Sequence, residues 1–123
     1  MALRAKVAAV SQKVSDGEFP HTRAVSQTGV PIRLNDERWQ HISQGHPELQ
    51  DQRARVLETI NHPDFIQEGD AGELLAIRFY ERTPLTSKFL VVAYRETSTR
   101  DGFVVTAYFT RRPSGRRMTL WKR

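Results

Sequence analysis

The chain of 123 residues contains no cysteine. This absence excludes disulfide bonds, thiol nucleophiles and cysteine-based zinc sites. The sequence also has no apolar run long enough to span a membrane, and Arg4 and Lys6 interrupt the short apolar stretch near its start, which argues against a signal peptide. We therefore expect a protein without membrane association that is located in the cytoplasm.

Several motifs of metal and cofactor enzymes are missing as well. There is no HExxH motif, and the glycines do not form a phosphate-binding or dinucleotide-binding loop. No nucleophile elbow marks a serine hydrolase. The sequence therefore predicts no metal and no cofactor.

Positive charge, in contrast, is in excess. Nineteen Lys and Arg residues against fourteen Asp and Glu residues give a net charge of +5. An excess of this kind favours a polyanionic partner, either nucleic acid, an acidic protein or an anionic membrane surface. A basic surface without a function is the simpler alternative.

The segment RWQHISQGHPEL (38–49) contains two of the four histidines, His41 and His46. The helical spacing of apolar residues predicts one helix before Pro47 and a second helix after it, which places His46 at the joint. The two histidines differ by about 140° around an ideal helix, so they do not form a metal pair. The simpler roles are a cap for His46 and a solvent-exposed position for His41.

Beyond Pro63 the apolar period changes from 3.6 to 2, which is typical of β-strands. Short links rich in turn-forming residues favour antiparallel pairing. We expect an α+β fold, with N-terminal helices packed on one face of a roughly four-stranded antiparallel sheet. The four strands are expected in DFIQEG (64–69), ELLAIRFYER (73–82), KFLVVAYRE (88–96) and GFVVTAYFTR (102–111).

The alternation of side chains assigns the two faces of this sheet. In the last strand one apolar row is expected to face the helices: Phe103, Val105, Ala107 and Phe109. The opposite face would then present a polar patch, because rows from neighbouring strands lie side by side. Its expected members are Arg78, Tyr80, Thr106, Tyr108 and Thr110.

Such a patch suits cleavage of RNA, in which the ribose 2′-hydroxyl is the nucleophile. Histidine transfers protons near neutral pH, cationic side chains stabilise the charge on phosphate, and Thr and Tyr hydroxyls can bind phosphate oxygens. Aromatic rings on an open sheet face can also stack unpaired bases. For each residue taken alone, an ordinary structural or surface role is the simpler alternative.

Four segments together resemble the phage and polymorphic-toxin nucleases of the barnase–EndoU–colicin–RelE-like superfamily. They are RLNDERWQHISQGHPEL (33–49), VLETINHPDFI (56–66), KFLVVAYRE (88–96) and GFVVTAYFTRRP (102–113). The resemblance covers residues 32–123 and leaves 1–31 as an N-terminal extension or linker. It implies a barnase- or RelE-like fold, metal-independent ribonuclease activity, and a cognate antitoxin or immunity protein as partner.

By this resemblance His46 is the first candidate for general acid or base and His41 is the second. The other residues expected to act in catalysis are Arg95, Thr106, Tyr108 and Thr110, and those expected to bind substrate are Lys88, Arg78 and Tyr80. The sequence thus predicts a toxin module that cleaves RNA through attack of the 2′-hydroxyl. A non-catalytic RNA-binding module and a protein-interaction domain of the same fold stay open as alternatives.

Overall fold

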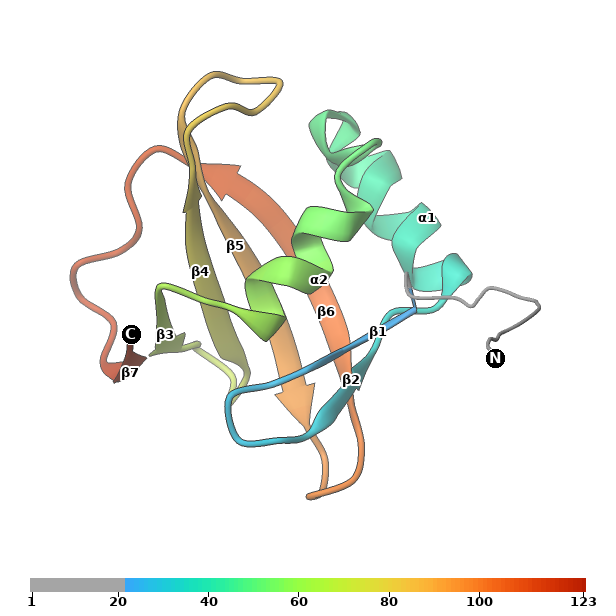
Figure 1. The fold of residues 1–123 in the computed structure, drawn as a ribbon, viewed down its shortest axis with the longest axis vertical. Helices are drawn as coiled ribbons and strands as arrows, with labels where there is room; N and C mark the ends of the chain where they lie inside the picture. Colours follow the sequence, from blue (N-terminus) through green and yellow to red (C-terminus); the bar gives the residue numbers. More distant parts are fainter. Residues whose placement is uncertain (1–21) are drawn as a thin grey trace, which may run out of the picture.

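The structure, a computed structural model, describes residues 22–123, so most of the expected N-terminal extension lies outside the described residues. Figure 1 shows a strongly curled sheet with two α-helices against it. The helices are α1 (Asp36–Gly45) and α2 (Arg53–Asn61), with a 3-10 turn η1 (Pro47–Leu49) between them. The strands are β1 (Arg23–Val25), β2 (Pro31–Arg33), β3 (Phe65–Glu68), β4 (Leu74–Tyr80), β5 (Lys88–Glu96), β6 (Gly102–Thr110) and β7 (Thr119–Lys122).

The described strands form one mixed sheet of seven, in the order β1-β2-β6-β5-β4-β3-β7. All neighbours are antiparallel except β2 and β6, which run parallel. The expected fold, N-terminal helices on a four-stranded antiparallel sheet, is therefore wrong. A β-hairpin precedes the helices, and β2 and β7 extend the four central strands on both sides.

The parallel contact between β2 and β6 depends on a glycine. Ile32 of β2 pairs with Gly102, seventy positions later in the chain. A Cβ atom at Gly102 would collide with the carbonyl oxygen of Arg95 and with the side chain of Ile32. The absence of a side chain here allows the close approach that joins the N-terminal hairpin to the central strands.

Local sequence signals position α1. The Asn35 side chain caps the helix by accepting a hydrogen bond from the backbone N–H of Arg38 at 2.8 Å. The helix ends at His46, whose backbone N–H donates to the carbonyl of Ile42 at 2.9 Å. Pro47 follows and disfavours helical geometry at His46, so the chain turns into η1. His46 therefore lies where the first helix ends, as the sequence predicts, but the second α-helix begins only at Arg53 and not at Pro47.

The second helix, α2, lies in the hollow of the curled sheet (Figure 1). Val56, Leu57 and Ile60 are buried there, and they pack in one core with residues of β4, β5 and β6. We call this helix-covered side of the sheet the inner face. The opposite side, the outer face, has a smaller buried cluster: Leu75, Ile77, Val91 and Ala93.

A connection of residues 111–118 leads from β6 to β7 and passes over the outer face. The side chain of Gln67 on β3 donates a hydrogen bond from Nε2 to the carbonyl of Ser114 at 2.8 Å. Figure 1 shows this connection running past β4 and β3 before it reaches β7. Part of the face that the sequence analysis leaves open is therefore covered by the chain itself.

A β-bulge in β6 changes which side chains face the helices. Tyr94 of β5 pairs with Val104, but Ala93 pairs with Thr106, so Val105 has no partner of its own. The extra residue interrupts the alternation, as bulges do. Val104 is consequently buried in the helix-side core, whereas Val105 packs against the outer cluster.

The prediction that the whole row faces the helices is therefore correct for only two of its four residues. Ala107 and Phe109 pack in the core of the inner face. Val105 lies on the outer face, and Phe103, which pairs with Arg95 before the bulge, also points there. An apolar pattern of period 2 does not reveal the bulge, because both sides of β6 contain apolar residues.

Candidate functional site

The nine residues selected from the sequence do not form one patch. Two of the expected patch members, Arg78 and Tyr80, lie on the inner face. Three residues come together where α1 ends beside β6: His46, Tyr108 and Thr110. Of the remaining four, Thr106 lies two residues before Tyr108 on the outer face of β6. His41, Lys88 and Arg95 do not line the hollow of Tyr108 and Thr110.

The contact between His46 and Tyr108 is the centre of the candidate site. Their ring centroids are 6.4 Å apart and the ring planes are tilted by 33°. Nδ1 of His46 lies 3.6 Å from Oε2 of Glu48, which is within ion-pair distance when the imidazole is protonated. The His46 side chain is 39% exposed, so the ring can meet both a substrate and water.

Backbone hydrogen bonds on both sides hold His46 in place. At the end of α1, its backbone N–H donates a hydrogen bond to the carbonyl of Ile42. Its own carbonyl accepts a hydrogen bond from the backbone N–H of Leu49 in η1, and both distances are 2.9 Å. Leu49 is fully buried, which anchors this turn to the core. The imidazole is therefore presented from a fixed joint between two helical segments.

On the outer face, Tyr108 and Thr110 line a hollow of about 100 Å³. Its floor is apolar and contains Leu75, Ile77 and Val91, and its rim is formed by the connection after β6. The rim contributes two cationic side chains, Arg112 and Arg117. The hollow thus combines hydroxyls and guanidinium groups, a set suited to an anionic group such as phosphate.

Neither arginine is among the nine residues selected from the sequence. The signal was present in the distribution of charge: residues 102–123 contain six basic residues and no acidic one. Residues 22–101 contain ten basic and twelve acidic residues. The positive excess of residues 22–123 therefore comes entirely from β6 and the segment after it, which we call the basic C-terminal segment (102–123).

Carboxylates neutralise only part of this charge. Arg117 forms a two-pronged ion pair with Asp70, with N–O distances of 2.8 and 3.2 Å, and its hydrogen bonds lower the pKa of Asp70. Arg123 pairs with Asp64 at 2.5 Å. Among the described residues, four basic side chains of the segment have no carboxylate partner: Arg111, Arg112, Arg116 and Lys122.

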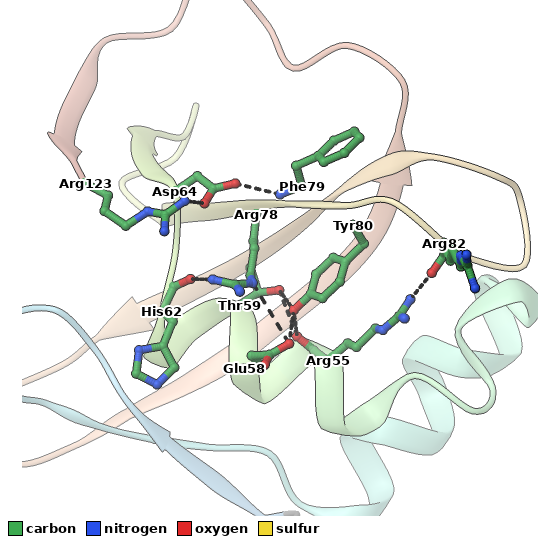
Figure 2. Close-up of polar contacts among 10 residues, drawn as sticks. All are labelled: Arg55, Glu58, Thr59, His62, Asp64, Arg78, Phe79, Tyr80, Arg82 and Arg123. Atoms are coloured by element: carbon green, nitrogen blue, oxygen red, sulfur yellow. Dashed lines mark hydrogen bonds and ion pairs between the residues drawn. The ribbon is translucent and has the colours of Figure 1, made fainter.

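Tyr80 and Arg78 belong to a different network, shown in Figure 2. The Tyr80 hydroxyl donates to Oε1 of Glu58 at 2.7 Å, and burial raises the pKa of this tyrosine above its usual range. Nη1 of Arg78 donates to the carbonyl of His62 at 2.7 Å, and its guanidinium lies 5.7 Å from the centre of the Tyr80 ring. These contacts fasten α2 to β4 and leave little of Tyr80 for a ligand.

The other selected residues are dispersed. His41 is exposed on α1 beside Arg38, in a different hollow from that of Tyr108. Lys88 begins β5, and Thr106 follows the bulge on the outer face. Arg95 donates from Nη2 to a carbonyl in the β3–β4 turn, four residues or about 13 Å along β5 from the position opposite Tyr108.

Within residues 22–123 no group of three or more His, Asp or Glu side chains is arranged to hold a metal ion. None of the helices described is long and apolar enough to cross a membrane. What the site offers is one imidazole for proton transfer, hydroxyls that can hydrogen-bond, and arginines for an anion. Comparison with known protein families, curated proteins and solved structures found no match for this chain.

Proposed function

We propose that the protein is a metal-independent endoribonuclease whose site lies where His46 meets Tyr108. The observation that supports this proposal is the contact of the two rings at 6.4 Å, beside a hollow lined by Thr110 and Arg112. Of the residues that the superfamily resemblance selects, His46 lies beside Tyr108, and Tyr108 and Thr110 line one hollow. Arg112 adds the positive charge that a phosphodiester requires.

In the proposed reaction the RNA supplies the nucleophile. Neutral His46 accepts the proton of the 2′-hydroxyl, and the 2′-oxygen attacks phosphorus. The bond from phosphorus to the 5′-oxygen breaks, and the protonated imidazole returns the proton to this leaving oxygen. The products are a 2′,3′-cyclic phosphate and a 5′-hydroxyl, and no other reactant is consumed.

The surrounding groups have separate roles in this proposal. Glu48 faces the imidazole, with Oε2 3.6 Å from Nδ1, and can form an ion pair with it after the proton has been taken up. The hydroxyls of Tyr108 and Thr110 hydrogen-bond to phosphate oxygens, and Arg112 balances the charge that develops on them. His41 is exposed at another place on α1, and we assign it no part in the reaction.

Incubation of total RNA with the protein in EDTA tests the proposal. The wild-type protein should release fragments with 2′,3′-cyclic phosphate ends, and His46→Ala should reduce the rate about 100- to 10,000-fold. His41→Ala is the matched control, because it removes the other α1 histidine, and it should leave the rate unchanged. Fragments with 3′-hydroxyl ends, no cleavage, or equal cleavage by His46→Ala would contradict the proposal.

The charge distribution favours a second candidate, an RNA-binding module without catalytic activity. The basic C-terminal segment alone provides a surface for a polyanion. This candidate predicts RNA binding that weakens with salt, together with intact RNA after incubation.

As a toxin module the protein would act on cytoplasmic RNA and arrest growth when expressed alone, and a cognate inhibitor that covers His46 would restore growth.

A further inference from the structure

Two phenylalanines form an aromatic surface next to the proposed site. Phe79 of β4 is 44% exposed although its ring is large and apolar, and Phe89 of β5 is half-buried beside it. The two ring centroids are 5.1 Å apart in an edge-to-face arrangement. We call this pair the Phe79–Phe89 platform.

The platform continues directly from the hollow. Thr110, Phe89 and Phe79 are cross-strand partners, so they form one row over β6, β5 and β4 on the outer face. Two strand spacings, about 10 Å, separate the backbone positions of Thr110 and Phe79. A ligand with its phosphate at Thr110 therefore has the platform within reach of a neighbouring part.

Several contacts hold the platform still. The backbone N–H of Phe79 donates to Oδ2 of Asp64 at 2.8 Å, as Figure 2 shows, and Arg123 binds the other oxygen of this carboxylate. Phe65 of β3 supports Phe89 from the side, with ring centroids 6.5 Å apart. The exposed ring of Phe79 thus stands on fixed backbone and needs little ordering when a ligand arrives.

We propose that an unpaired RNA base stacks on the Phe79–Phe89 platform, so that the protein selects single-stranded RNA. This inference rests on the proposed function for the position of the phosphate. Every base has a face that can stack on an aromatic ring, and exposed rings next to cationic side chains are the usual means of binding single strands. The basic C-terminal segment provides those cations, since Arg111 and Arg112 follow Thr110 directly.

The same surface is unsuited to a duplex. Bases inside a helix are stacked on each other and paired, so they present edges but no faces to a protein. The platform is an apolar row on one face of the sheet, whereas duplex RNA is recognised along its backbone and minor groove. A base must therefore leave its stack before it can cover Phe79.

Binding of a labelled 2′-O-methyl RNA oligonucleotide, measured by fluorescence anisotropy, tests this inference without cleavage, because its 2′-oxygen cannot attack. The wild-type protein should bind the single strand at least ten times more tightly than a duplex of the same sequence. Phe79→Leu keeps an apolar side chain but removes the ring, and it should weaken single-strand binding about 5- to 100-fold. Phe79→Trp should restore or strengthen binding, since indole presents a larger stacking face.

Val25→Ala is the control, because Val25 is 51% exposed on β1, at the far edge of the sheet, and the change should leave affinity unaltered. All variants are first compared with wild type by circular dichroism. Equal binding of single strand and duplex, or unchanged binding by Phe79→Leu, would overturn the inference even if RNA is cleaved. Stacking that depends on Phe79 without cleavage of natural RNA would support the platform and refute the ribonuclease.

Discussion

Tyr80 and Phe79 are consecutive residues of β4, yet they have opposite surroundings. Tyr80 points to the inner face and is 9% exposed, with its hydroxyl bonded to Glu58 and two arginines against its ring. Phe79 points to the outer face, is 44% exposed, and has another phenylalanine as its aromatic neighbour. The same strand thus carries Tyr80, whose ring and hydroxyl have partners inside the fold, and Phe79, whose ring is partly exposed to solvent.

A similar difference separates the groups around these two residues. On the inner face, Tyr80 is bonded to Glu58 and Arg78 to the carbonyl of His62. In the basic C-terminal segment, four basic side chains have no carboxylate partner among the described residues, and His46 meets Tyr108 at the margin of the outer face. We conclude that the inner network stabilises the fold, and that the outer face is the side on which a ligand can act.

Replacing the two neighbours separately gives the largest expected effect. Tyr80→Ala should lower the free energy of unfolding by about 3–5 kcal/mol, because it opens a cavity and leaves Glu58 without its donor. Phe79→Ala should cost only about 1 kcal/mol, since much of that ring is already exposed. Urea denaturation followed by circular dichroism measures both. Similar losses for the two variants would show that the faces do not differ in the way described.

The sequence predicts the central part of this molecule well. The four expected strands are found as β3 to β6, and the helices on either side of Pro47 are present, because hydrophobic period, caps and prolines are local signals. The expectation that Tyr80 and Tyr108 lie in one patch on the same face of the sheet is wrong. Tyr80 follows the alternation of β4 correctly, but the helices cover its side of the sheet and not the other side.

The signals that were missed are not local. The contact of β2 with β6 joins Ile32 to Gly102, and β7 reaches β3 only after its connection passes over the outer face. The bulge at Val105 arises from pairing between strands and has no mark in the alternation of β6. For the site, His46 lies beside Tyr108, which lines a hollow with Thr110, but His41 and Arg95, which the resemblance also implies, lie elsewhere. The role of these residues in a reaction stays a prediction. Arg112 required the charge distribution and the path of the chain.

Removal of positive charge from the basic C-terminal segment should have a smaller effect, and this effect should be on RNA binding. Arg111→Ala with Arg112→Ala removes two exposed arginines beside Thr110 and should weaken binding of single-stranded RNA. If both contact phosphates, the slope of log affinity against log salt should flatten by about 1.4. Arg23→Ala with Arg100→Ala removes the same charge from exposed positions outside the segment and should leave the slope unchanged. Equal slopes for the two double variants would remove the segment from the binding surface.

The ion pair of Asp70 with Arg117 should give the smallest effect, because both groups are on the surface. Arg117 holds the pKa of Asp70 below its ordinary value of 3.8, so the folded state binds the proton less well than the unfolded state does. The pair therefore stabilises the fold above that value, and the contribution disappears as the pH falls through the lowered pKa. Urea unfolding of wild type and Asp70→Asn should differ slightly at pH 7 and converge in acid. If the difference in unfolding free energy between the two proteins grows in acid, the pKa of Asp70 is raised and not lowered. Arg117 would then face the hollow without this partner.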